Sequence, residues 1–288
     1  MAKQPLIGVL SSNLSSYFVR RMHAGISQAL QGKDYALKFF AMDGKTDLAY
    51  HRFVETVSDE PGLKGLVYGH LPLSVNQVAR FRGRGIAVAG VAEQMPGIDW
   101  VTVDEAKGAY LATQHLLEIG HRKIALFNGR PLAVSSRLRE EGFLQALAEK
   151  GIFFGRDKDM RILNFSEDEG REAMELLLDL PEPPTAVFVA AGDSAALGAM
   201  RAMRDRGVEC PSRMSLVGFD NLEFSAHIHP RLTTVNQPLE AMGEWAALRL
   251  IDAIENPAHK PQGEIFEPSL VLRDSVALPW AAGKQSAV

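Results

Sequence analysis

Apolar runs of strand length alternate with segments of helical period along almost the whole chain. Each apolar run is unbroken, and unbroken runs are typical of parallel sheets that helices cover on both faces. The pattern therefore predicts an α/β fold built on parallel sheets. The predicted strands are Leu6–Leu10, Ala36–Ala41, Gly65–Gly69, Ile86–Val91, Lys123–Phe127, Met160–Phe165, Ala186–Ala190 and Ser215–Phe219.

The segments between these runs carry the period of amphipathic helices. In the segment Gly108–Ile119, the residues Ala109, Ala112, Leu116 and Leu117 share one face at helical spacing. Such a face indicates a helix that packs on a sheet. The other predicted helices are Phe18–Leu30, Gly142–Lys150 and Ser194–Arg206.

The alternation of strands and helices breaks at three places. One strand follows another without a helix near Trp100–Asp104, and the chain runs extended near Thr233–Pro238 and Phe266–Pro268, where proline restricts its neighbours. Because 288 residues are many for one hydrophobic core, the breaks predict three crossings between two lobes with a cleft between them. We expect an amino-terminal lobe of residues 1–103 and 236–267, and a carboxy-terminal lobe of residues 104–235 and 268–288.

Composition and charge exclude several classes of protein. No apolar run approaches the roughly 20 residues of a membrane span, and the first ten residues lack the successive regions of a signal peptide, so we expect a cytoplasmic protein. The single cysteine, Cys210, excludes an internal disulfide and a cysteine-based metal site. The net charge is -4 and no Lys/Arg-rich stripe stands out, so the chain as given should bind DNA poorly.

Five segments stand out along the chain, namely Ile7–Phe18, His115–Leu126, Arg137–Phe143, Pro184–Met200, and Ser215–Asn221 followed by Leu232–Pro238. In this order they resemble the core of the lactose/galactose repressor (LacI/GalR) family and its relatives, the periplasmic sugar-binding proteins. The resemblance covers almost the whole chain. It implies a periplasmic-binding-protein-like fold, with two Rossmann-like lobes whose parallel sheets are joined by three crossings.

The resemblance also implies a function, namely the effector-binding, dimer-forming core of a transcription regulator. The expected partners are a small-molecule effector (a sugar, a sugar phosphate or a related metabolite), a second copy of the chain, and operator DNA. DNA would be read by a helix-turn-helix headpiece, which we expect to be absent from this chain. No membrane partner and no cofactor are expected.

Two other functions remain open from the sequence. A sugar-binding receptor of a transporter would share the fold, and a signal peptide, which is not indicated here, would distinguish it. An α/β enzyme is disfavoured because no nucleophile elbow, P-loop, zinc-protease motif or dinucleotide fingerprint is present. His227 and His229 flank Ile228, but no third ligand lies near them in the sequence, so a loop role is favoured over a metal site.

The first wall of the predicted ligand site follows the first strand. Small polar residues and two aromatic rings come after it, at the carboxyl edge of a parallel sheet, where open α/β folds bind ligands. Taken alone, two such aromatics are more often core residues. The resemblance implies instead that they stack on the ligand, so we assign Asn13, Ser15, Tyr17 and Phe18 to the site.

The second wall centres on two arginines. Arg139 lies between the polar loop Val134–Ser136 and a predicted helix, so its guanidinium can hold ligand hydroxyls or an anion, as the resemblance implies. For an arbitrary arginine at a helix start, a solvated surface role is the more common one. Arg137 either lines the same wall or is exposed.

Acidic and amide groups complete this wall. Asp220 directly follows an apolar strand and can accept hydrogen bonds from ligand hydroxyls or amines, although an Asp-Asn turn is the alternative reading. By the resemblance we add Phe165, Asp193 and Gln237. We also expect Arg139 and Asp220 to be solvated in the empty protein, so that truncating either costs little stability.

Two glycines depart from the family pattern. Gly192 stands where relatives commonly have Asn, and Gly90 stands where several have Asp. These changes predict a pocket with fewer polar groups and more room. Such a pocket favours a bulkier ligand, or one whose anionic group meets Arg139.

Overall fold

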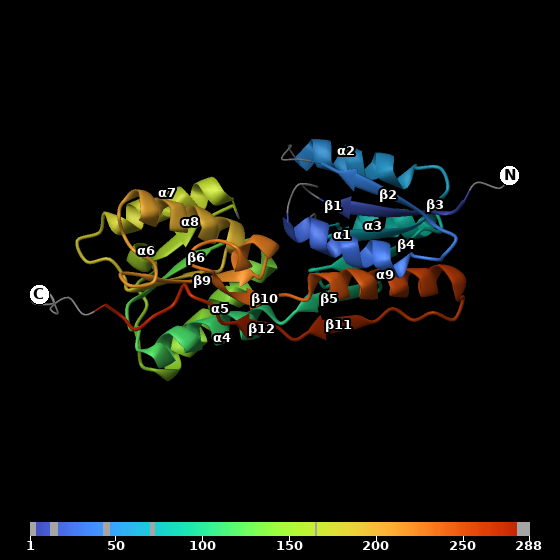
Figure 1. The fold of residues 1–288 in the computed structure, drawn as a ribbon. Helices are drawn as coiled ribbons and strands as arrows, with labels where there is room; N and C mark the ends of the chain where they lie inside the picture. The colour runs from blue at the N-terminus through green and yellow to red at the C-terminus, as the bar shows by residue number, and fades with distance from the viewer. Residues whose placement is uncertain (1–3, 12–16, 43–46, 70–72, 165, 281–288) are drawn as a thin grey trace, which may run out of the picture. The chain divides into compact units, whose positions relative to one another are not determined.

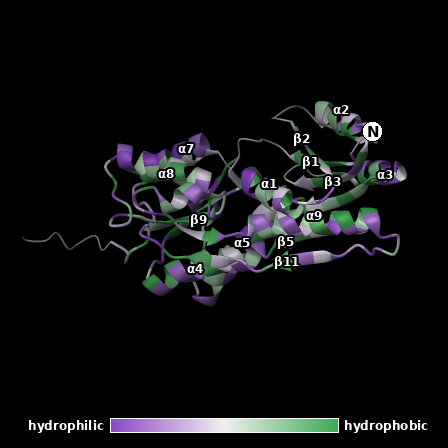
Figure 2. Ribbon diagram, turned by 45° about the vertical axis from the view of Figure 1, so that its right-hand side comes forward, coloured by the Kyte–Doolittle hydropathy of each residue, from purple (hydrophilic) through white to green (hydrophobic). Residues whose placement is uncertain are grey.

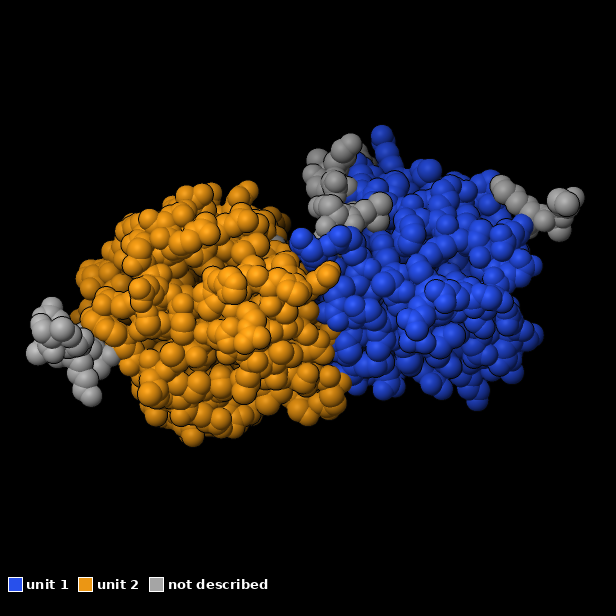
Figure 3. All heavy atoms as spheres, viewed as in Figure 1, with its two compact units in different colours: residues 1–103, 238–266 blue, residues 104–237, 267–288 orange. Residues whose placement is uncertain are grey.

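The computed structural model describes residues 4–11, 17–42, 47–69, 73–164 and 166–280, which belong to two compact units (Figure 3). Unit 1 consists of Met1–Val103 and Pro238–Phe266, and unit 2 of Asp104–Gln237 and Glu267–Val288. The chain therefore passes between the units three times, as the breaks in the alternation predicted. None of the described helices is long and apolar enough to cross a membrane.

Unit 1 is a six-stranded parallel sheet with two helices on each face (Figure 1). The strand order is β11-β5-β4-β3-β1-β2. Apolar residues of α1 and α9 form one core against the sheet, and those of α2 and α3 form the other. The elements are β1 (Leu6–Ser11), α1 (Tyr17–Ala29), β2 (Ala36–Ala41), α2 (Asp47–Ser58), β3 (Leu63–Gly69), α3 (Val75–Gly83), β4 (Ala87–Val91), β5 (Asp99–Val103), α9 (Leu239–Glu255) and β11 (Gly263–Phe266).

Unit 2 repeats this architecture. Its sheet has the order β12-β10-β9-β8-β6-β7, and only the β10–β12 pair is antiparallel. Helices α4 and α5 cover one face, and α7 and α8 the other. The elements are α4 (Glu105–Ile119), β6 (Ile124–Asn128), α5 (Val134–Glu149), α6 (Arg156–Asp159), β7 (Met160–Ile162), α7 (Glu167–Leu178), β8 (Ala186–Val189), α8 (Asp193–Asp205), β9 (Ser215–Asp220), the 3-10 helix η1 (Glu223–Ala226), β10 (Thr233–Asn236) and β12 (Ser269–Val271).

The hydropathy of each element follows its place in these layers. The helices carry both hydrophilic and hydrophobic residues, and the central strands are predominantly hydrophobic (Figure 2). Strand β2 differs from the prediction of full burial, because it lies at the sheet edge and is partly exposed along its length. Strand β7 ends at Ile162, earlier than predicted.

Helix α5 begins eight residues earlier than the sequence predicted. The residues Val134–Ser136, interpreted above as a polar loop, form its first turn, and no side chain caps it at Ala133. Helices α4 and α5 pack closely because α5 carries a glycine at the contact: a Cβ atom at Gly142 would clash with the carbonyl oxygen of Ala106. Arg139 is consequently a helical residue one turn before this contact.

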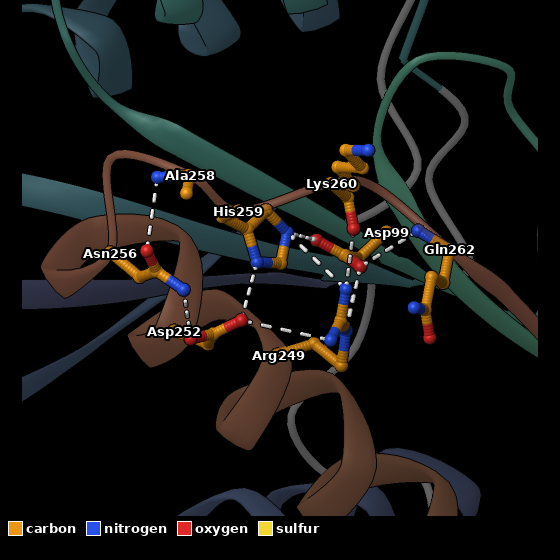
Figure 4. Close-up of polar contacts among 8 residues, drawn as sticks. All are labelled: Asp99, Arg249, Asp252, Asn256, Ala258, His259, Lys260 and Gln262. Carbon is orange, nitrogen blue, oxygen red and sulfur yellow. Dashed lines mark hydrogen bonds and ion pairs between the residues drawn. The ribbon is translucent and has the colours of Figure 1, made fainter.

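A polar cluster fixes the return of the chain from α9 to β11 (Figure 4). Asp99, at the start of β5, accepts hydrogen bonds from Arg249 Nε at 2.8 Å and from the backbone N–H of Gln262 at 3.0 Å. The two ring nitrogens of His259 lie 2.6 Å from carboxylate oxygens of Asp99 and Asp252. We call these five residues the Asp99 cluster. It ties the loop before β11 to the amino ends of the sheet in unit 1.

Candidate functional site

The candidate site lies at the carboxyl edge of the sheet in unit 2. The strand order reverses between β6 and β8, and the carboxyl ends of strands beside such a reversal are where open α/β sheets bind ligands. Strand β9 ends there at Asp220, and Gln237 follows β10 directly. Arg139 and Asp193 reach the same edge from α5 and from the start of α8. These four residues are called the unit 2 edge below.

Arg139 is held inside the unit by three contacts. Its Nε donates to Glu105 Oε2 at 2.7 Å, its Nη1 donates to the carbonyl of Ala190 at 2.6 Å, and its guanidinium lies 3.8 Å from the ring centre of Phe219. The residue is 5% exposed, and Glu105 is 4% exposed. The prediction that Arg139 is solvated is therefore wrong, because the close packing of α4 and α5 encloses both charges.

The charge of Arg139 is compensated within the protein. Burial alone would lower the pKa of its guanidinium, but Glu105 and then Asp220 outweigh burial and hold the pKa above its ordinary value. A carboxylate in contact with a buried guanidinium compensates its positive charge, so the guanidinium attracts a second anion only weakly. Arg139 thus supports the shape of the edge, and its contact with ligand stays a prediction.

Asp193 is fully buried, and both of its carboxyl oxygens are occupied. Its Oδ1 accepts from the hydroxyl of Thr234 at 2.6 Å, and its Oδ2 accepts from the backbone N–H of Leu222 at 2.8 Å. Burial raises the pKa of Asp193 well above its ordinary value, and the charge of Asp220 raises it further. These contacts position the turn after β9, and the contact of Asp193 with ligand stays a prediction.

Asp220 is the partly exposed acid of the edge. Its Oδ1 accepts from Gln237 Nε2 at 2.6 Å, and Gln237 Oε1 is buried with no hydrogen-bond partner among the described residues. Asp220 and Asn221 have φ angles of 106° and 52°, in the region where non-glycine residues are strained. Strain of this kind gathers at binding sites, where the surrounding contacts maintain it. Asp220 is therefore both the first residue of the Asp-Asn turn and a residue of the predicted site.

The two departures from the family pattern do not create the predicted room. A Cβ atom at Gly192 would lie 2.7 Å from Asp220 Oδ2, and one at Gly90 would lie 3.1 Å from the hydroxyl of Tyr68. The space beside each glycine is thus filled by the protein's own side chain. Gly192 also has a φ of 98°, which other residues rarely adopt.

Replacing Gly192 by Asn is expected to disturb the edge. The new side chain would meet the Asp220 carboxylate, and the backbone would be strained by roughly 1–3 kcal/mol. We expect Gly192→Asn to lower the melting temperature by several degrees. The control is Gly207→Asn, at a φ of 68° with no atom within 4 Å of a Cβ, so it reports the effect of an asparagine at positive φ without a close contact. Equal melting temperatures for the two variants would contradict a close approach at Gly192.

The other predicted site residues are placed as follows. Arg137 is exposed on α5. Tyr17, the first residue of α1, is 40% exposed, and the guanidinium of Arg20 lies 4.4 Å from its ring centre. Phe18 is buried in the core between α1 and the sheet of unit 1, which is the more common position for such an aromatic residue. The three remaining predicted residues, Asn13, Ser15 and Phe165, lie outside the described residues.

Sequence reasoning missed two residues near the unit 2 edge. Asn128 ends β6 and is buried, and its side chain donates to the carbonyl of Ser136 at 2.9 Å. A polar residue at the end of an apolar strand was the available signal, as it was for Asp220. Glu105 gave no such signal. The helix dipole favours acidic residues in the first turn of any helix, so an acid there does not indicate a functional site.

Metal binding finds no support at this site. Among the described residues, no group of three or more His, Cys, Asp or Glu side chains is arranged to hold a metal ion. His227 lies in the turn directly after η1, and His229 lies in the bend that follows. Both are therefore loop residues, as expected from the sequence.

A family model described as a periplasmic binding protein-like domain matches residues 113–276, more than half of the chain. Along most of its length the chain resembles an uncharacterised HTH-type transcriptional regulator of Streptomyces limosus, which is 32% identical over 293 residues, covering 96% of this chain and 80% of the relative. A solved structure described as a LacI family transcriptional regulator covers 95% of this chain. This chain belongs to the LacI family.

Solved structures of other LacI-family members share the fold. A regulator of Enterococcus faecium with bound ribose superposes with a TM-score of 0.85 at 26% identity, covering 95% of this chain and 99% of that chain. The Lac repressor dimer bound to operator and an anti-inducer gives a TM-score of 0.82 at 25% identity, covering 96% and 95%.

The chain spans about half the length of several curated relatives that it matches. The repressor PurR of Actinobacillus pleuropneumoniae is 38% identical over 180 residues, which are 62% of this chain and 53% of the relative. The probable repressor ExuR of Bacillus subtilis is 35% identical over 173 residues, 60% of this chain and 51% of the relative.

Proposed function

We propose that this chain is the effector-sensing core of a LacI-family transcription regulator. The observation that carries the proposal is the unit 2 edge, where buried and partly buried polar groups gather beside the strand reversal of an α/β sheet. Ligand sites of this fold combine an enclosed edge with a few fixed polar groups. A regulatory role agrees with the relatives, whose names describe repressors and regulators.

The chemistry of the edge favours a neutral ligand rich in hydroxyl groups. Arg139 is already paired with Glu105, so an anionic ligand such as a sugar phosphate would find no uncompensated cation in this residue. Asp220 can accept hydrogen bonds from hydroxyls, and Gln237 keeps a buried acceptor without a partner among the described residues. A similar protein holds ribose, which supports a sugar as the class of effector.

The proposed mechanism is a shift between conformations. A ligand changes such an equilibrium only through its difference in affinity for the two states. We propose that the response reaches operator DNA through a helix-turn-helix headpiece, that the working form is a cytoplasmic homodimer, and that no reaction is catalysed. A transporter receptor is less well supported, because the relatives reported above are regulators.

The proposal is tested by ligand binding to the wild-type chain and to Asp220→Asn. We expect a neutral pentose or hexose, D-ribose first, to raise the melting temperature, because a ligand at 100 times its dissociation constant stabilises by about 2.7 kcal/mol. Asp220→Asn should weaken calorimetric affinity by about tenfold to hundredfold, since it removes a charged acceptor.

The matched control for Asp220→Asn is Asp168→Asn, which removes one exposed carboxylate from α7 of the same unit. This variant should bind as the wild type does. A sugar that binds the wild type and Asp220→Asn with equal affinity would place the ligand elsewhere. No response to any neutral sugar in the panel would contradict the proposed effector class.

A further inference from the structure

We propose that Arg273 is a positioning residue of the effector site, which holds the Asp220-Asn221 turn in the conformation that binds ligand. The inference rests on the proposed function and deepens it, because it adds to the unit 2 edge a residue that acts through the turn rather than by contact with ligand. Arg273 follows β12 and is partly buried. Asn221, the residue of the turn that it contacts, lies 52 residues earlier in the sequence.

The guanidinium of Arg273 joins three points of the chain between β9 and β10. Its Nη2 donates to Asn221 Oδ1 at 2.6 Å, and its Nη1 donates to Ser225 Oγ at 3.0 Å and to the carbonyl of Leu232 at 2.7 Å. The backbone N–H of Arg273 donates to Thr233 Oγ1 at 2.9 Å, which fixes the place of the arginine itself. One side chain therefore connects the turn after β9, the 3-10 helix η1 and the residue before β10.

These contacts act on the strained part of the unit 2 edge. Asp220 and Asn221 have φ angles of 106° and 52°, and non-glycine residues keep such angles only where surrounding contacts maintain them. The amide of Asn221 is held on both sides, because its Oδ1 accepts from Arg273 and its Nδ2 donates to Asn236 Oδ1 at 2.9 Å. Removing the guanidinium would leave the turn with one contact fewer against its strain.

The position of the Asp220 carboxylate depends on this turn. A side chain moves with its Cα atom, so relaxation of the Asp220-Asn221 backbone toward ordinary angles would displace the carboxylate. It would also disturb the hydrogen bond that Asp220 Oδ1 accepts from Gln237 Nε2 at 2.6 Å. A protein that populates the binding conformation only part of the time has its affinity reduced by that fraction.

The charge of Arg273 suits it to this role. All three acceptors of its guanidinium are neutral oxygens, and a charged donor forms stronger hydrogen bonds than a neutral one does. Arg231 makes a different use of its charge. It forms an exposed ion pair with Asp274, at 2.6 and 2.9 Å, which joins the same two segments of the chain without contacting the turn.

The experiment measures the affinity for D-ribose by calorimetry, well below the melting temperature of each variant. Arg273→Met keeps an unbranched side chain and removes the donors, so we expect about tenfold weaker binding, as for a turn that is competent about one tenth of the time. Arg273→Lys keeps the charge and one donor group and should recover part of this loss. It also carries the comparison if Arg273→Met does not fold.

Two further variants make the result specific. In an Asp220→Ala background, Arg273→Met should change the affinity by less than about twofold, because no carboxylate remains to be positioned. The matched control Arg231→Met removes the neighbouring arginine, which joins the same segments, and should bind D-ribose as the wild type does.

The outcomes separate this inference from the proposed function. An Arg273→Met protein that melts earlier but binds D-ribose with wild-type affinity would make Arg273 purely structural, and would leave the sugar-sensing core intact. Equal losses with and without the Asp220 carboxylate would also overturn the inference.

A measurement without ligand decides the inference if D-ribose does not bind the wild type, a result that would count first against the proposed effector. The backbone N–H of Leu222, which donates to Asp193, should exchange with solvent faster in Arg273→Met than in Arg231→Met. Equal exchange in the two variants would show that Arg273 does not hold the turn.

Discussion

Replacing Arg139 by Leu is expected to lower the free energy of unfolding by about 3–5 kcal/mol, because the substitution leaves Glu105 buried without its partner. It also removes the hydrogen bond to Ala190 and the contact with the ring of Phe219. Urea unfolding followed by circular dichroism measures the effect. This result would reverse the expectation from the sequence that truncating Arg139 costs little.

Two further variants make the result specific. Arg137→Leu removes an exposed arginine from the same helix and should change stability by less than about 0.5 kcal/mol. The double variant Arg139→Leu with Glu105→Leu removes both charges and should recover a large part of the loss, since apolar pairs often replace buried ion pairs well. An Arg139→Leu protein that unfolds at the wild-type urea concentration would show that the pair is not buried in solution.

The second large effect is expected at the Asp99 cluster of unit 1. Asp99 is 2% exposed and accepts hydrogen bonds from Arg249, His259 and the backbone N–H of Gln262. Asp99→Ala leaves these donors without their shared acceptor, so we expect a loss of about 3–5 kcal/mol. Hydrogen exchange should rise most in the segment from Asn256 to Phe266, because the cluster holds that segment to the sheet.

The control for Asp99 is an acid of the same unit whose ion pairs are exposed. Asp59 pairs with Arg80 and Arg84 on the surface, and such pairs are worth about 0–1 kcal/mol. Asp59→Ala should therefore leave the unfolding midpoint nearly unchanged. Similar losses for the two aspartates would mean that the cluster adds nothing beyond a surface ion pair.

Much of the fold could be predicted from the sequence because burial leaves a local pattern. Most strands in the interior of both sheets are predominantly apolar, and β1, β6 and β8 lie where the unbroken runs predicted strands. Strands β11 and β12 at the sheet edges were not predicted, since exposed edge residues carry no such pattern, and only the link between them near Phe266–Pro268 was expected to run extended. The start of α5 was missed because Val134–Ser136 is polar and lacks a capping side chain before it.

The candidate site, like the fold, could be predicted only in part. Asp220 was predicted because it follows an apolar run, and Gln237 was added by the family resemblance. The structure places them at the ends of the neighbouring parallel strands β9 and β10. The partners that decide their chemistry could not be predicted. Glu105 meets Arg139 only because α4 and α5 pack closely, and the room beside Gly192 is taken by a side chain from another strand. Such contacts depend on tertiary packing between residues distant in the sequence.

Because the chain passes between the units three times, unit 1 can be completed only after most of unit 2 has been synthesised. Unit 1 takes its first hundred residues from the start of the chain, but α9, which supplies Leu239, Met242 and Leu250 to its core, is made much later. The early segment therefore leaves the ribosome with one face of its sheet covered by α1 alone, and α9 is added only after most of unit 2 has been synthesised. During this interval the growing chain exposes apolar strands, which makes it a natural client for chaperones that bind unfinished hydrophobic surfaces.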